Sequence, residues 1–237
     1  MFEARWLTID DRQRMFRALA RPRADHRSLW LFACACCRLI PELASDDQAS
    51  HALGEAESCA SGLLPREDLQ KHWPGPLPDG GSREARMALQ WVVQPWLDGW
   101  TAWKAAMAAG TIMQTGTPAM VSTTSETGER LGRRAERRAA GRAKKARRLL
   151  LGHLLHDIFR PPSPLPRIDA VVLTWNKGIV GKIARAINEE RRFDEVPILA
   201  DALEEAGCID ADILDHCRAP RPHTRGCWVV DIILGRG

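Results

Sequence analysis

The sequence contains no tyrosine and little that favours β-structure. Runs of Val, Ile and Thr alternating with polar residues are scarce, so a sandwich or barrel is not expected. An apolar run of about eighteen residues, long enough to cross a bilayer, is also missing. The first ten residues carry Glu3, Arg5 and Asp10 where a secretory signal needs an apolar core. These absences predict a helical protein of the cytoplasm without a membrane span.

The chain also lacks the short motifs of several enzyme classes. It has no glycine-rich phosphate loop after a strand, no G-x-S-x-G nucleophile elbow and no H-E-x-x-H zinc pair. The sequence therefore contains no recognisable motif for nucleotide hydrolysis or acyl transfer. Catalysis is not expected from these patterns, and no small-molecule substrate is inferred.

Ala, Leu, Arg and Glu at helical spacing predict a mainly α fold. We expect an irregular multi-helix bundle with one long basic helix and a compact C-terminal helical cap. In that cap, Asp194 is expected to cap a helix that Gly207 ends, and Asp210 to begin the next one. The expected helices are residues 12–19, 25–40, 46–63, 82–108, 124–159, 177–191, 195–206 and 211–217.

Two segments rich in Pro and Gly divide the chain into three expected parts. Residues 73–81 and 160–167 are the expected linkers. They separate an N-terminal helical part (1–72), a middle part with long helices (82–159) and a C-terminal helical block (168–237).

The charge is concentrated in one segment, residues 130–148. The whole chain has a net charge of +4, but this segment has ten cations and one acid, Glu136. Such a basic helix favours an anionic partner, DNA or RNA, or else neutralises the acidic remainder of the protein. The residues that would contact nucleic acid or another partner are Arg130, Arg133, Arg134, Arg137, Arg138, Arg142, Lys144, Lys145, Arg147 and Arg148.

Thiols and imidazoles gather near the C-terminus, just before the apolar segment 228–234. Zinc takes three or four such ligands, but usually in close pairs such as C-x2-C, which this segment lacks. We expect free thiols packed in the core, like Cys34, Cys36 and Cys37 near the N-terminus, and histidines bonded to nearby carbonyls. No cofactor is then bound. The alternative is a zinc site drawn from Cys208, His216, Cys217, His223 and Cys227.

A second cluster is the pair His156-Asp157, with His153 one turn earlier. Adjacent His and Asp are typical of metal-dependent phosphohydrolases, provided that further ligands complete the shell. Otherwise the pair is expected to lie half-exposed near a helix C-terminus, where an imidazolium ion is favoured.

Parts of the sequence resemble a large family of uncharacterised bacterial paralogues. Residues 193–235 (LADALEEAGC…HCR…H-x-RGCWVVD) and 172–178 (VLTWNKG) resemble its C-terminal module. Residues 5–7 and 27–40 (RSLWLFACACCRLI) resemble its N-terminal signature. The resemblance implies a shared helical fold and brings no activity. Where this chain has His156, the family tends to have Arg before the aspartate.

Together these observations predict a non-catalytic helical module for interaction or regulation. A protein partner is expected first, because the basic segment, a tryptophan-rich segment (91–103) and proline spacers are typical of binding scaffolds. Nucleic-acid binding through residues 130–148 is the first alternative, and a metal-dependent phosphohydrolase at the His-Asp pair is the second.

Overall fold

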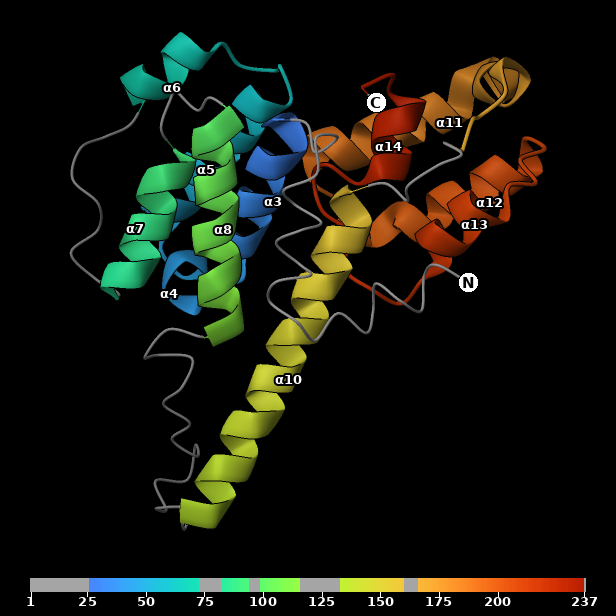
Figure 1. Ribbon diagram of the computed structural model, residues 1–237. Coiled ribbons are helices and arrows are strands. Elements are labelled where there is room, and N and C mark those ends of the chain that lie inside the picture. The colour runs from blue at the N-terminus through green and yellow to red at the C-terminus, as the bar shows by residue number, and fades with distance from the viewer. Residues whose placement is uncertain (1–25, 73–81, 94–98, 116–132, 160–165, 237) are drawn as a thin grey trace. The chain divides into compact units, whose positions relative to one another are not determined.

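The computed structural model describes residues 26–72, 82–93, 99–115, 133–159 and 166–236. Within these residues the chain forms helices and no β-strand, which confirms the mainly α prediction (Figure 1). No helix among them is long and apolar enough to span a membrane. The chain divides into two compact units, Met1–Gly152 and His153–Gly237. The expected division into three parts stays a prediction, and its linker 73–81 and most of 160–167 lie outside the described residues.

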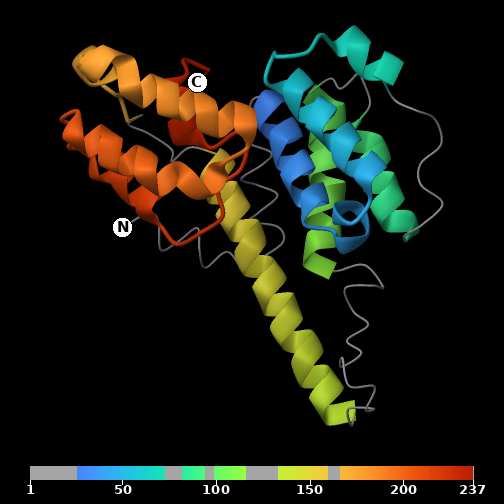
Figure 2. The ribbon, with the colours of Figure 1, turned by 180° about the vertical axis from the view of Figure 1, so that it is seen from behind.

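The first unit is organised around helix α3 (His26–Arg38). This helix packs against α5, α7 and α8, and its position beside α5 and α8 is visible from opposite sides in Figures 1 and 2. The other described helices of the unit are α4 (Pro41–Ala44), α5 (Asp47–Ala60), α6 (Arg66–His72), α7 (Arg83–Val92), α8 (Gly99–Thr115) and the first part of α10 (Arg133–Ile158).

Helix α3 is central because it is apolar around most of its circumference. Cys34, Cys36 and Cys37 are fully buried in it, as the sequence predicted for core thiols. Trp30 is also fully buried, and its indole N–H donates to the backbone oxygen of Val92 at 2.7 Å. This bond joins the middle of α3 to the end of α7.

The single helix expected over residues 82–108 is wrong. The structure has two helices, α7 and α8, which pack against each other. Pro95 stands between them in the sequence, and proline disfavours a continuous helix because it has no backbone N–H. Trp91 lies half-buried at the end of α7, with the Lys104 ammonium 5.6 Å from its ring centroid.

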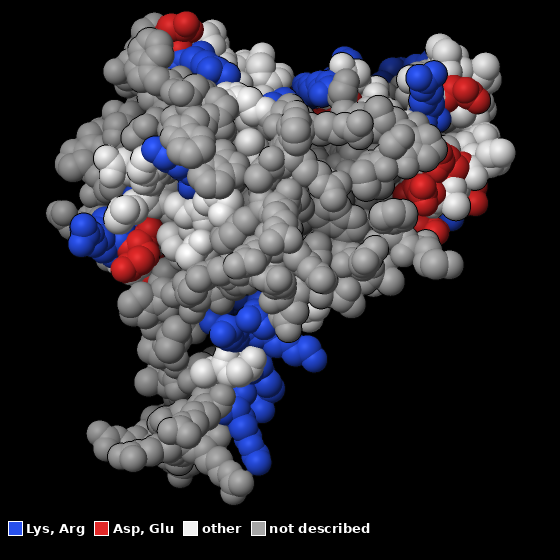
Figure 3. Space-filling view, viewed as in Figure 1, with Lys and Arg blue, Asp and Glu red and all other residues white. Residues whose placement is uncertain are grey.

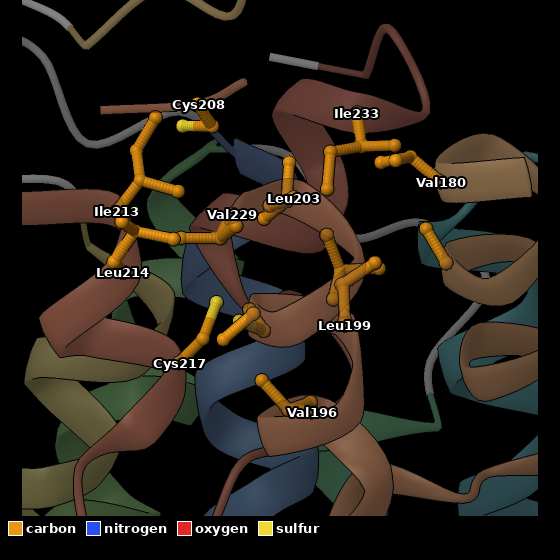
Figure 4. Close-up of a cluster of buried hydrophobic side chains, with 14 of the residues drawn as sticks. Val180, Val196, Leu199, Leu203, Cys208, Ile213, Leu214, Cys217, Val229 and Ile233 are labelled. Carbon is orange, nitrogen blue, oxygen red and sulfur yellow. The ribbon is translucent and has the colours of Figure 1, made fainter. Parts of the chain in front are cut away.

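The second unit surrounds a core of apolar side chains from four helices (Figure 4). The last turns of α10 enter this unit. The other elements are α11 (Ala170–Glu190), the 3-10 turn η1 (Phe193–Glu195), α12 (Val196–Glu205), α13 (Ala211–Arg218) and α14 (Trp228–Ile233).

Helix α11 begins earlier than expected and contains an interruption. It starts at Ala170, and Asn176, Lys177 and Gly178 then adopt left-handed φ angles of 45°, 59° and 72°. Asn and Gly tolerate this region best. The helix start predicted at residue 177 falls on this interruption. The long regular part of α11 lies beyond it, which is why the sequence pattern indicated a helix only from there.

The turn between α12 and α13 follows the sequence closely. Gly207 has a φ of 94°, and the N–H groups of Gly207 and Cys208 bond to the oxygens of Glu204 and Leu203. These two bonds form a Schellman motif, which ends α12. Asp210 then caps α13 by accepting from the N–H of Ile213 at 3.2 Å. The expected Asp194 cap is wrong, since that residue lies inside the turn η1 and α12 has Glu195 at its N-cap without a side-chain bond.

The apolar segment near the C-terminus forms α14, the anchor of the unit. Trp228 is 2% exposed, and Val229 and Val230 are buried beside it. The apolar composition of residues 228–234 accounts for this burial, whereas a helix over these residues is not among those expected from the sequence. Cys227, at the N-cap of α14, therefore occupies a fixed place where the preceding loop meets the core.

Candidate metal centre

Four buried side chains meet in the second unit: Asp157, His216, His223 and Cys227. Asp157 comes from the last turn of α10, His216 from α13, and the other two from the loop between α13 and α14. One ligand-type atom of each lies within 4.8 Å of all the others. None of the four residues is more than 8% exposed. The chain thus brings together oxygen, nitrogen and sulfur donors from positions 66 residues apart.

The loop that carries His223 and Cys227 is held in place by hydrogen bonds to backbone oxygens. The Arg225 guanidinium is buried and donates to the backbone oxygen of Asn188 at 2.7 Å, which fastens the loop to α11. The N–H of Cys227 bonds to the oxygen of Thr224 at 3.0 Å and closes a turn before α14. His223 and Cys227 therefore face the cluster from a constrained turn.

Asp157 is fully buried and accepts four hydrogen bonds. Its Oδ1 contacts Nδ1 of His223 at 2.6 Å and Nε2 of His216 at 3.2 Å. Its Oδ2 accepts from the backbone N–H of Thr224 at 2.7 Å and from that residue's hydroxyl at 3.3 Å. A buried carboxylate needs such partners, because burial without them costs several kcal/mol.

The hydrogen bonds set the charge state of the carboxylate. Burial alone would raise the pKa of Asp157, but hydrogen bonds from His216 and His223 outweigh it and hold that pKa well below its usual range. Burial lowers the pKa of His216, so its ring is neutral at pH 7. The contact between them is therefore a charge-assisted hydrogen bond and not an ion pair.

The tautomer of His216 follows from its other nitrogen. The indole N–H of Trp228 can only donate, and it lies 3.0 Å from Nδ1 of His216. The neutral ring must then accept at Nδ1 and carry its proton on Nε2. That proton points to Asp157 and to the sulfur of Cys227, which is 3.3 Å from Nε2.

The thiol of Cys227 is protonated in this arrangement. Burial raises its pKa well above the ordinary value, and the negative charge of Asp157 raises it further. A buried neutral thiol is a poor nucleophile. Cys227 therefore serves either as a packing group or as the ligand of a cation that removes its proton.

The spacing of the four atoms suits a tetrahedral ion. With ligand atoms about 2.0–2.3 Å from zinc, neighbouring corners lie roughly 3.3–3.6 Å apart. The observed separations include 3.2 Å from Asp157 to His216, 3.3 Å from His216 to Cys227 and 3.9 Å from Cys227 to His223. The 2.6 Å contact of Asp157 with His223 is shorter than such an edge and would have to lengthen.

The structure sorts the predicted zinc ligands into two groups. His216, His223 and Cys227 join the cluster, whereas Cys208 and Cys217 lie among the apolar side chains of the core (Figure 4). Cys217 follows His216 on α13, and adjacent helical residues point about 100° apart. Burial raises the Cys217 pKa to about 12, as for a packing thiol. The expected bonding of the histidines to carbonyls is wrong, since both contact Asp157 instead.

The structure also separates the two residues of the His-Asp pair, since one belongs to the cluster and the other does not. The expectation of a half-exposed pair is wrong, because Asp157 is fully buried and His156 is 8% exposed. Only Asp157 belongs to the cluster, while His153 and His156 do not. Sequence reasoning had singled out Asp157 but linked it to its neighbour, because no local signal connects it to residues near the C-terminus.

The predicted basic contact residues lie mainly on α10. Arg130 lies outside the described residues, and Arg133, Arg134 and Arg137 belong to a part of α10 whose side chains are not described. Further along the helix, Arg147 and Arg148 are half-buried. The exposed cations are Arg138, Arg142, Lys144 and Lys145.

The stability of the second unit is expected to fall on acidification. The folded-state pKa of His216 is lowered, so unfolding takes up a proton below the usual value of ~6.5 and the stabilisation present above that pH is lost. Asp157, whose pKa is also lowered, adds to the loss below about pH 4. Melting temperatures measured in chelator from pH 8 to pH 4 test this. His216→Gln should flatten the curve between pH 7 and pH 5, and an unchanged slope would contradict the assignment.

Searches of protein-family models, of curated proteins and of solved structures found no match to this chain.

Proposed function

We propose that this protein is a non-catalytic helical binding module whose second unit holds one structural zinc ion. The proposal rests on one observation, the convergence of four ligand-type atoms from three segments in a buried place. The proposed ligands are Asp157 Oδ1, His216 Nε2, His223 Nδ1 and Cys227 Sγ.

The number of ligands favours a structural role over a catalytic one. Structural zinc sites have four protein ligands, whereas catalytic sites keep one position for water or substrate. Four protein atoms would complete a tetrahedron here, and all four residues are buried. An ion so enclosed would tie the end of α10 to α13 and to the loop before α14.

Charge balance supports the ion. A zinc ion with an ionised Asp157, a Cys227 thiolate and two neutral imidazoles has a net charge of zero. Without a metal, the Asp157 carboxylate is a buried negative charge whose histidine partner His216 is neutral at pH 7. Burying a neutral set is less costly than burying an isolated charge.

Ligation also has a cost that can be measured. When Nε2 of His216 binds zinc, the neutral ring carries its proton on Nδ1, where the indole N–H of Trp228 now donates. Two donors then face each other, so the hydrogen bond between Trp228 and His216 must break. Zinc binding is therefore expected to shift the indole N–H resonance of Trp228.

The test is metal analysis of the full chain, purified without chelator and without a histidine tag. We expect about one equivalent of zinc, and a cobalt-substituted protein with the visible absorption of a tetrahedral thiolate site. Cys227→Ser should reduce the zinc content at least tenfold, because a hydroxyl is a poor zinc ligand. Treatment with chelator should lower the melting temperature.

Cys217→Ser is the matched control. Cys217 is as deeply buried as Cys227 and lies ten residues earlier, but it is not in the cluster. The Cys217→Ser variant should retain zinc even if its fold becomes less stable. Zinc below a tenth of an equivalent after growth with added zinc, with no effect of chelator on the melting temperature, would overturn the proposal and leave Asp157 as the centre of a metal-free hydrogen-bond network.

A further inference from the structure

The middle of α10 carries cations without acids. Residues 138–152 contain six Lys or Arg and no Asp or Glu. Four of the six, Arg138, Arg142, Lys144 and Lys145, are exposed, and we call them the cationic face. Lys and Arg side chains accordingly gather along this helix in the space-filling view (Figure 3). A row of exposed like charges on one helix carries an electrostatic cost unless an anion lies beside it.

The cationic face has a regular geometry. Arg138, Arg142 and Lys145 follow one another at steps of four and three, so they form one row along the helix. Lys144 lies beside this row. At a rise of 1.5 Å per residue, the row is about 10 Å long and presents a cation every 5–6 Å. Rigid spacing of this kind suits a polymer with regularly repeated negative charges.

The protein's described acids do not neutralise this face. Arg192 pairs with Glu190 and Glu195, and Arg218 pairs with Asp201 and Glu204. No comparable ion pair joins the cationic face to any carboxylate of the described residues. Within the described residues, the alternative from the sequence, that these charges offset the acidic remainder through contacts, therefore gains no support.

The apolar side chains next to the cationic row favour one class of partner. A helix that lies on a membrane needs large apolar side chains such as Leu, Phe or Trp on its second face. Beside the cationic row the apolar positions are Ala139, Ala143 and Ala146, whose methyl groups provide little insertion energy, and the first leucine is Leu149, beyond the row. Hot spots of protein interfaces are enriched in Trp, Tyr and Arg, and residues 138–152 contain no Phe, Tyr or Trp to fill a pocket on a protein partner. A phosphate backbone needs neither feature.

We propose that the cationic face of α10 binds the phosphate backbone of nucleic acid without reading its sequence. This inference is independent of the zinc site. Four contacted phosphates give a salt slope of roughly −3.6, so affinity should fall about 100-fold between 50 and 200 mM salt. Binding is then micromolar or weaker at physiological salt, as is usual for contacts to the backbone alone.

The experiment uses the full chain and fluorescently labelled duplexes of 25 base pairs, with two unrelated sequences, in anisotropy titrations from 50 to 200 mM salt. Both duplexes should bind equally. Arg142→Glu with Lys145→Glu should weaken binding at least tenfold at 50 mM salt and reduce the slope by about two. Far-UV circular dichroism checks that the helix persists.

Lys182→Glu with Arg185→Glu is the matched control. These residues are exposed on α11, have the same spacing of three and change the net charge by the same amount. Binding that survives this change identifies α10 as the site. Equal losses in both double variants would overturn the proposal, since net charge alone would then explain binding. The proposal is also overturned if phosphatidylserine vesicles bind at 50 mM salt while the duplexes do not.

Discussion

Replacing Asp157 with Ala is expected to destabilise the second unit by about 3–5 kcal/mol, because several hydrogen bonds to one charged acceptor are lost together. The change removes the acceptor of four hydrogen bonds, among them those from Nε2 of His216 and from the N–H of Thr224. The free energy of unfolding of a typical domain is only about 5–15 kcal/mol, so a loss of this size raises the unfolded fraction measurably. Chemical denaturation followed by tryptophan fluorescence measures the loss. Zinc content should fall in the same variant if the ion is bound.

A second variant keeps this prediction testable if the first one does not fold. Asp157→Asn preserves the volume but replaces one acceptor oxygen with an NH2 group, which opposes a donor. It should cost less than Ala but still about 1–3 kcal/mol. Asp212→Ala on α13 is the control, because this aspartate is exposed and its loss should stay within about 0.5 kcal/mol. Similar behaviour of Asp157→Ala and Asp212→Ala would contradict the central role of the carboxylate.

Trp228→Ala should have a comparable effect for a different reason. The indole is 2% exposed, its ring centroid lies 4.7 Å from that of His216, and it anchors α14 in the core. Removing a buried tryptophan costs about 3–5 kcal/mol because the surrounding side chains cannot fill the cavity. Loss of the indole donor adds to this cost. Thermal and chemical denaturation should both show the change, and a full-length variant with unchanged stability would refute the anchor role.

Trp228→Phe separates packing from hydrogen bonding. It retains most of the apolar volume, but His216 loses the donor at Nδ1, so the metal-free protein should lose about 1 kcal/mol. The same change removes the nearer of the two donors that face Nδ1 of His216, the other being the Arg221 guanidinium at 3.4 Å, so zinc should bind more tightly to this variant than to the original protein. Competition with a chelator measures the affinity. Weaker zinc binding in Trp228→Phe would contradict the proposed change of tautomer. Ile232→Ala, on the same helix and half-buried, should leave zinc affinity unchanged.

The sequence predicted the helical elements wherever local signals were sufficient. Apolar periodicity indicated α3, α5 and α12, and local chemistry fixed the turn from Gly207 to Asp210. It failed where two local signals competed, as at residues 82–108, where Pro95 interrupts an otherwise helical pattern. The burial of Trp228 followed from composition alone, because residues 228–234 are too apolar to remain exposed.

The cluster around Asp157 required the tertiary structure. Cys208, His216, Cys217, His223 and Cys227 have similar ligand chemistry in the sequence, and only the direction of each side chain separates the three in the cluster from the two in the core. Asp157 is 66 residues from His223, and no periodic pattern carries information over that distance. Residue types and local spacing thus determine helices, caps and the charge of α10. Packing of the helices around one core decides which donors meet, because a ligand set is a property of distances in space.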